Sequence, residues 1–293
     1  MDMMVAVDLS HEPDALMGRV LPWSTRFSGR LHLRVVSRGV YDAGGDFGGL
    51  HDPSLALRLA QHQQGEREAL DELVKRLPSD RVASAEVLAG EVGPSLVRAA
   101  DYVDLIVLGT HGRKGLERVF LGSVAERLVR KANVPVMVLP LTAEPIPTSG
   151  TLTAMCPVDA RDVDLLALQR LQAWHGDNVE PHLVYVLPDL RLSREMGFVR
   201  QPVEAPTEHP LLPWAEARIR RAMDEAGCAS TPLHFVLSED SHPAYELAKF
   251  GEAQAVDLVA MPTHGRTGWS RFAFGSVTEQ LVRIMPTSCL VVR

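Results

Sequence analysis

One stretch of sequence occurs twice at a constant distance, and this repeat restricts the fold more than any other feature of the chain. Residues 104–126 contain a short apolar run, several glycines and a Ser-x-x-Glu sequence, and residues 257–279 repeat this order of features. Matching residues are 153 positions apart in three pairs: Asp104 and Asp257, Gly112 and Gly265, and Ser123 and Ser276. A constant offset across a whole motif predicts two copies of one domain.

Each copy of the repeated stretch predicts a strand, a glycine-bearing loop and a helix. In the first copy, residues 105–108 have the length and composition of a buried strand, and glycines follow directly. Ser123 stands three residues before Glu126, which is a capping-box signature for a helix that Ser123 caps. Such a loop presents backbone N–H groups and the positive end of a helix dipole, and both favour a phosphate.

Strand-like and helix-like segments alternate along both copies. We therefore predict an α/β fold of two repeated, doubly wound domains, each with a five-stranded parallel sheet. In the first copy, the expected strands are 3–7, 31–36, 82–88, 105–108 and 134–139, and the expected helices are 15–27, 55–77, 94–100 and 123–131. In the second copy, the expected strands are 152–158, 182–186, 233–237, 258–261 and 288–293, and the expected helices are 214–226 and 244–250.

The ends of the first and fourth strands carry the residues of chemical interest. Parallel sheets of this type bind ligands outside the carboxyl ends of their strands, where the strand order reverses. Asp8 follows the first strand, and the glycines follow the fourth. If these strands are neighbours, both groups face one crevice. We expect surface loops at 38–53 and 188–213, domains at 1–142 and 151–293, and a proline-containing linker at 143–150.

Composition narrows the class of protein. A chain of 293 residues with 46% hydrophobic and 23% charged residues is typical of a soluble protein of two domains. The net charge of −7 argues against nucleic acid as a partner, and no apolar run has the length of about 20 residues that spans a membrane. The start of the chain has no basic segment, so we predict a cytoplasmic protein. Cys156 and Cys289 fall on predicted strands, as buried apolar residues rather than reactive thiols.

The glycine pattern of the first copy is complete, because Gly109, Gly112, Gly122 and Ser123 give Gly-x2-Gly-x9-Gly-Ser. With this motif the chain resembles the universal stress protein family, in a tandem two-domain form. The resemblance implies an adenine nucleotide alpha hydrolase-like fold and two domains packed as a pseudo-dimer through their fifth strands. It also implies binding of ATP, with Mg²⁺ arriving on the nucleotide, and a regulatory role in the stress response.

The same resemblance assigns roles to individual residues. Asp8 would contact the adenosine part, Val35 the adenine, and the glycines with Ser123 the phosphates. In the first copy, the implied binding residues are Asp8, Val35, Gly109, His111, Gly112, Arg113, Gly122, Ser123 and Val124. In the second copy, the residues matched by position are Asp159, Val186, Gly265, Arg266, Gly275, Ser276 and Val277. Pro262 replaces the first glycine there and has no N–H, which leaves nucleotide binding in the second copy open.

Other interpretations remain open. Asp8 is also typical of a residue that caps the entry to a helix. The loop histidines His111 and His264 are also typical of turns, and Arg113 is also typical of a solvated loop position. The whole chain is also compatible with an interaction scaffold in which the glycine loops are structural. Its partner would be another protein or a second copy of the chain. A slow ATP hydrolase would need His111 or Lys114 near the γ-phosphate. The sequence has no P-loop, and no Ser-His-Asp order or metal-binding spacing stands out.

Overall fold

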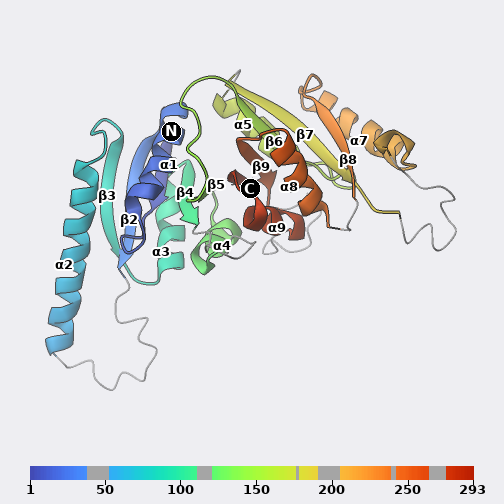
Figure 1. The fold of residues 1–293 in the computed structure, drawn as a ribbon. Coiled ribbons are helices and arrows are strands. Elements are labelled where there is room, and N and C mark those ends of the chain that lie inside the picture. Colours follow the sequence, from blue (N-terminus) through green and yellow to red (C-terminus); the bar gives the residue numbers. More distant parts are fainter. Residues whose placement is uncertain (38–52, 111–120, 176–177, 191–204, 239–241, 264–274) are drawn as a thin grey trace. The chain divides into compact units, whose positions relative to one another are not determined.

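The computed structural model describes residues 1–37, 53–110, 121–175, 178–190, 205–238, 242–263 and 275–293. These residues form two compact units, the first ending at Ser149 and the second beginning at Gly150 (Figure 1). No helix in the described ranges is long and apolar enough to cross a membrane. The pseudo-dimer packing of the two domains stays a prediction.

The first unit is a parallel sheet covered by helices. Its strands are β1 (Asp2–Ala6), β2 (Arg30–Ser37), β3 (Val82–Ala89), β4 (Leu105–Thr110) and β5 (Val136–Pro140). Its helices are α1 (Pro13–Arg26), α2 (Pro53–Lys75), α3 (Val92–Ala99) and α4 (Ser123–Lys131), and the 3₁₀ helix η2 (Ala100–Tyr102) follows α3. The strand order is β3-β2-β1-β4-β5. In Figure 1, α2 runs alongside β3, with which it is in contact.

The second unit repeats this arrangement. Its strands are β6 (Leu152–Pro157), β7 (Val179–Leu187), β8 (Leu233–Leu237), β9 (Leu258–Pro262) and β10 (Ser288–Val292). Its helices are α5 (Leu166–His175), α7 (Leu212–Glu225), α8 (Pro243–Ala253) and α9 (Ser276–Ile284), and the 3₁₀ helix η4 (Pro206–Glu208) precedes α7. The strand order is β8-β7-β6-β9-β10, with parallel pairs throughout.

Strand order confirms the predicted doubly wound fold. In each unit the chain runs outward from the first strand to the third and then returns to the other side of the first strand. The order therefore reverses between β1 and β4, and between β6 and β9. The carboxyl ends of these neighbours lie at one edge of the sheet, which is where such folds bind ligands.

Burial explains why these segments are strands. The side chains of β5 and β10 are buried along their whole length, and those of β4 and β9 along most of it. Near-continuous apolar runs are typical of parallel strands that helices cover on both faces. All three cysteines are buried and free, as predicted for Cys156 and Cys289, and burial raises the pKa of each of these two thiols to about 12.

The predicted capping boxes are wrong in both copies. Gly122 and Gly275 are the N-cap residues, no side chain caps either helix, and each serine is the first helical residue. Glu126 forms an ion pair with Arg130, 3.0 Å away and four residues later in the same helix. An i,i+4 pair of this kind draws the glutamate along the helix instead of back to its start.

Helix α5 is the one described α-helix that the sequence did not predict. An aspartate marks its start: the Asp164 carboxylate accepts a hydrogen bond of 2.9 Å from the Leu166 N–H. An aspartate in this place satisfies one of the amide groups that a helix leaves without a partner. Leu168 and Leu171 are fully buried and hold the helix against the sheet.

Candidate functional site

A cavity of about 760 Å³ lies in the second unit, at the carboxyl ends of β6, β7 and β9 and the start of α9. This is the position at which the reversal of strand order predicts a ligand. The cavity has three chemically different parts: an amide side at the start of α9, an acidic side after β6, and an apolar side beside β7 and α7.

The amide side is made by Gly275, Ser276 and Val277 at the start of α9. Two hydrogen bonds hold it in place: Gly275 N–H donates to the Thr263 oxygen at 3.1 Å, and the Thr278 hydroxyl donates to the Pro262 oxygen at 3.1 Å. Gly275 is the N-cap residue of α9, and no side-chain cap is found among the described residues. The first amide groups and the positive end of the helix dipole therefore suit an anion.

The acidic side consists of Asp159, Asp162 and Asp164, which follow β6. The Asp159 carboxylate accepts hydrogen bonds from the Arg161 backbone N–H at 2.9 Å and from its guanidinium at 2.8 Å. Burial raises the pKa of Asp159, but the hydrogen bonds and charge of Arg161 outweigh this effect and lower it overall. The carboxylate is thus ionised at neutral pH and accepts hydrogen bonds.

The apolar side includes two aromatic residues, Tyr185 and Trp214. Tyr185 is buried and packs edge-on against Phe235, with ring centroids 6.3 Å apart. Burial and the nearby Asp159 charge raise the pKa of Tyr185, so its hydroxyl stays a hydrogen-bond donor. Trp214 is 42% exposed, and the Arg218 guanidinium lies 5.6 Å from its ring centroid. A half-exposed indole beside a cavity offers a flat surface on which a ring can stack.

The register of the two sheets shows which positions correspond. In the first unit Met4 pairs with His32, and in the second unit Met155 pairs with His182. Each methionine lies four residues before the aspartate that follows its strand. His32 and His182 therefore occupy the same place on their strands.

This correspondence corrects one prediction. Val35 lies three residues after His32, and Tyr185 lies three residues after His182. Tyr185 therefore occupies the position of Val35, and Val186 is one residue further along the strand. Val186 was matched to Val35 by the sequence offset that relates Asp159 to Asp8. This offset is correct for the first strands of the two units but not for their second strands. Successive residues of a strand point to opposite faces, so Tyr185 occupies the buried position that the valine has in the first unit. Val186 nevertheless lines the cavity.

In the first unit the aspartate is likewise held by its own loop. The Asp8 carboxylate accepts hydrogen bonds from the Ser10 N–H at 3.0 Å and from the Ser10 hydroxyl, and His11 Nδ1 lies 3.1 Å away. Burial raises the pKa of Asp8, but the contacts with Ser10 and His11 lower it overall. Val35 is buried, with 4% of its surface exposed. The carboxylate remains 59% exposed and is open to a ligand.

The two glycines described in the first motif differ in their surroundings. A Cβ atom on Gly109 would come within 2.9 Å of Leu141 and 3.1 Å of Leu16, whereas one on Gly122 would meet nothing within 4 Å. Packing of the surrounding side chains thus explains Gly109, while neither packing nor a left-handed backbone explains Gly122. The loss of a glycine at Pro262 therefore does not by itself argue against a phosphate site in the second unit.

The remaining predicted residues fall partly outside the structure. His111, Gly112, Arg113, Gly265 and Arg266 lie outside the described residues. Ser123 is exposed at the first position of α4, and Val124 is half-buried beside it. The sequence missed Asp162, Asp164, Tyr185 and Trp214 as cavity residues. They come from a loop, a strand and a helix, and no local pattern links them.

Comparison with known proteins assigns the family. The model of the universal stress protein family matches residues 1–140 and again 152–293. A universal stress protein of Mycobacterium tuberculosis is 28% identical over 266 residues, covering 80% of this chain and 74% of the relative. Another, from Mycolicibacterium smegmatis, is 24% identical over 267 residues, covering 82% of this chain and 81% of the relative.

Solved structures agree on the fold. The crystal structure of a universal stress protein from Archaeoglobus fulgidus superposes with a TM-score of 0.69 at 15% identity, over 100% of this chain and 98% of that one. A putative universal stress protein from Pseudomonas aeruginosa superposes with a TM-score of 0.60 at 18% identity, over 99% and 92% of the two chains. With two matches to the family model that together span nearly all its residues, the chain belongs to the universal stress protein family.

Proposed function

We propose that this protein binds an adenine nucleotide, ATP with Mg²⁺, in its second domain, and that the bound nucleotide regulates a cytoplasmic response to stress. The observation that carries the proposal is the division of the cavity into an amide side, an acidic side and an apolar side. A nucleotide has three matching parts: phosphates, sugar hydroxyls and a flat base.

Each part of the ligand has partners in the cavity. The amide groups at Ser276 and Val277 are donors for the phosphates, as helix N-termini commonly are. The ionised Asp159 accepts from a sugar hydroxyl or an amine. The base stacks on Trp214 and contacts Tyr185, where apolar surface is available. Mg²⁺ prefers oxygen ligands, which nucleotide phosphates and carboxylates such as Asp162 supply.

The first domain supports the same proposal on one point. Gly122 has open space where a Cβ would stand and precedes a helix without a side-chain cap. Glycine is favoured where a phosphate approaches the backbone closely. We therefore propose that Asp8, Val35, Gly122 and Ser123 form a second nucleotide site, together with predicted residues outside the described ranges.

Calorimetry with ATP and Mg²⁺ on the full chain tests the proposal. Gly275→Glu puts bulk and negative charge at the start of α9, and Gly122→Glu does the same at α4. We expect the wild type to bind, Gly275→Glu to lose the site of the second domain, and Gly122→Glu to lose that of the first. The two variants are matched controls for each other, because each leaves the other domain unaltered.

The interaction scaffold is the outcome that would replace this proposal. If the folded wild type binds neither ATP nor another adenine nucleotide with Mg²⁺ present, and carries none after purification, the nucleotide-dependent role is abandoned. A homodimer or a protein partner would then be the next object of study.

A further inference from the structure

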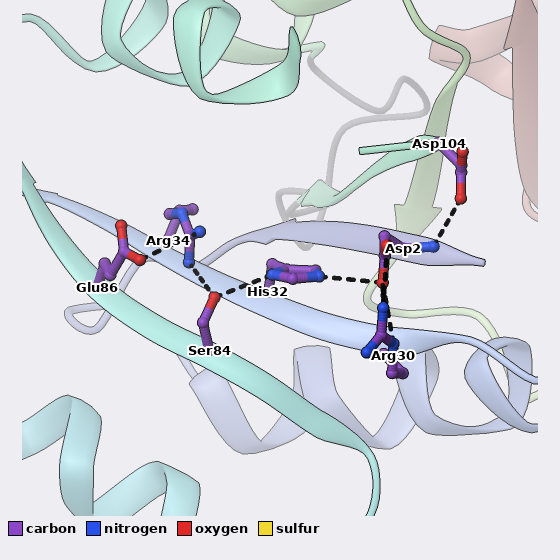
Figure 2. Close-up of polar contacts among 7 residues, drawn as sticks. All are labelled: Asp2, Arg30, His32, Arg34, Ser84, Glu86 and Asp104. Carbon is purple, nitrogen blue, oxygen red and sulfur yellow. Dashed lines mark hydrogen bonds and ion pairs between the residues drawn. The ribbon is translucent and has the colours of Figure 1, made fainter. Parts of the chain in front are cut away.

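A second cavity, of about 650 Å³, lies in the first domain on the face of the sheet that α3 covers. His32 and Arg34 of β2, Ser84 and Glu86 of β3, and Arg98 of α3 contribute to its wall. None of these residues belongs to the proposed nucleotide sites. Figure 2 shows the polar side chains of β1, β2 and β3 in a connected row on this face.

The centre of the row is a serine, a histidine and an aspartate in hydrogen-bond contact. Ser84 Oγ lies 2.9 Å from His32 Nδ1, and His32 Nε2 lies 3.2 Å from Asp2 Oδ1 (Figure 2). The strand register fixes this arrangement, because His32 pairs directly with Ser84 on the neighbouring strand. The His32 side chain is 20% exposed, so the row is accessible from the cavity.

The neighbouring charges assign the protons. The Asp2 carboxylate can only accept, which places the hydrogen of the imidazole on His32 Nε2 and leaves Nδ1 to accept from the Ser84 hydroxyl, whose oxygen also accepts from Arg34 Nη1 at 2.9 Å. His32 Nε2 then carries the hydrogen and donates to the Asp2 carboxylate. The hydrogen bond from His32 lowers the pKa of Asp2, burial opposes this effect, and the Arg30 charge reinforces it. An ionised aspartate, an oriented imidazole and a serine are the parts of a hydrolytic triad.

We propose that Asp2, His32 and Ser84 form a second functional site, which hydrolyses small esters. Ser84 Oγ adds to the ester carbonyl carbon while its proton passes to His32 Nδ1. The carbonyl oxygen becomes negative, and the Arg34 guanidinium, already in contact with Ser84 Oγ, stabilises it. The bond to the alcohol oxygen then breaks, and the departing oxygen takes the proton from His32 Nδ1.

Water completes the reaction. It adds to the acyl group on Ser84 while His32 Nδ1 accepts one of its protons, and Ser84 Oγ recovers that proton as the acyl bond breaks. The products are an acid and an alcohol, so the only co-reactant is water. Asp2 does not touch the reacting atoms and is a positioning residue, which holds the imidazole with Nδ1 toward the serine.

A cavity of about 650 Å³ has room for a small-molecule ester. Leu88, Ala99 and Val103 supply apolar wall, and the Arg98 guanidinium donates to Ser95 Oγ at 3.2 Å at the side of α3. Arg34 and Arg98 outweigh Glu86 in charge, which favours an ester that bears a negative group.

The second domain lacks the same row. Its backbone matches, because Thr153 N–H donates to Asp257 at 2.8 Å just as Asp2 N–H donates to Asp104 at 2.7 Å. Thr153 therefore stands in the place of Asp2. The register of β7 and β8 puts Pro232 in the place of Ser84. Only the histidine is retained, so the row is not a general requirement of the fold.

The test uses the full-length protein with 4-nitrophenyl acetate and 4-nitrophenyl butyrate, and a fluorophosphonate probe followed by peptide mass spectrometry. We expect the probe on Ser84, and a loss of kcat/KM of about 100-fold or more in Ser84→Ala and His32→Ala. Asp2→Asn should lower kcat and leave KM nearly unchanged, which a merely structural role would not do. Ser79→Ala, an exposed serine between α2 and β3, is the control and should behave as wild type.

Two results with the wild type and with Ser84→Ala would overturn the proposal. One is wild-type protein that folds, as judged by circular dichroism, but is not modified at Ser84. The other is ester hydrolysis that Ser84→Ala leaves unchanged, since exposed lysine and histidine side chains would then account for it. Ser84→Cys provides a further check that is independent of the alanine variant, because its thiol should be acylated by the same esters if the site is catalytic. Without acylation of the folded Cys variant, the row is a structural hydrogen-bond network.

Discussion

The histidine at one position of the second strand has different neighbours in the two domains. In the first domain, His32 contacts Ser84 and Asp2 in a polar row beside a cavity. In the second domain, His182 contacts His234, with 2.9 Å between their nitrogens and 5.0 Å between ring centroids, and Phe250 of α8 packs on His234. The same backbone position therefore faces a polar, accessible surface in one copy and a stack of rings in the other.

The two copies thus share the arrangement of the backbone but differ in the side chains on one face of the sheet. Both domains have the same strand order, the same helix without a side-chain cap after the fourth strand, and an aspartate held by its own loop after the first. The features that differ are side chains on the first and third strands, where Thr153 and Pro232 stand in the places of Asp2 and Ser84. The first domain thus carries the candidate ester site, and the second carries the cavity that we propose as a nucleotide site.

The largest expected effect concerns the tryptophans of the first helices, which are 151 residues apart in the sequence. Trp23 is 1% exposed and stacks on Phe27, whereas Trp174 is only partly buried and lies near Arg170. Trp23→Ala should lower the free energy of unfolding by about 3–5 kcal/mol, and Trp174→Ala by about half of that or less. Urea unfolding followed by circular dichroism measures both. Equal losses of unfolding free energy would mean that the two tryptophans contribute equally to stability despite their different burial.

The next effect concerns Trp214, which lines the cavity of the second domain. Removing a surface on which a base stacks costs about 1–3 kcal/mol, which corresponds to a loss of about 5- to 150-fold in affinity. Trp214→Ala should weaken ATP binding by this factor in calorimetry, and Trp214→Phe should retain most of the affinity. Trp174→Ala is the control. Unchanged binding in Trp214→Ala would show that the base lies elsewhere.

Gly109 and Gly122 separate packing from ligand binding in the first domain. Gly109→Ala should lower the free energy of unfolding by about 1–3 kcal/mol, because its Cβ would press on Leu141 and Leu16. Gly122→Ala should change it by less than about 0.5 kcal/mol, because the space is open. Urea unfolding of the two variants provides the measurement. A large loss in Gly122→Ala would assign a structural role to that glycine.

The smallest effect is a dependence on pH in the second domain. Burial lowers the pKa of His234 below 6.5, and the charge of the neighbouring His182 lowers it further. The unfolded chain therefore binds a proton at a higher pH than the folded one, so stability is complete above 6.5 and falls as the pH drops through the folded pKa. His234→Gln should reduce this fall. Thermal unfolding of both proteins from pH 8 to 5 would show it, and identical slopes would contradict it.

The repeat, the parallel sheets and most of the helices and strands follow from the amino-acid sequence alone. A period of 153 residues needs no structure to be seen, and apolar runs between helical patterns indicate buried strands directly. The helix beginning at Ser123 was also predicted, but the predicted capping box was wrong, because Glu126 pairs with Arg130 instead of the backbone at the helix start. Both alternatives are local, and the sequence alone does not say which of them the glutamate adopts.

Which residues come into contact depends on the tertiary structure. Asp2, His32 and Ser84 are distant in the sequence and come together because β1, β2 and β3 are adjacent in one register. The same holds for Tyr185 and Trp214, which come from a strand and a helix and both line the apolar side of the cavity. A shift of one residue in strand register reverses the face on which a side chain lies. Local pattern fixes the period of a strand, but its position against its neighbours is set by long-range packing.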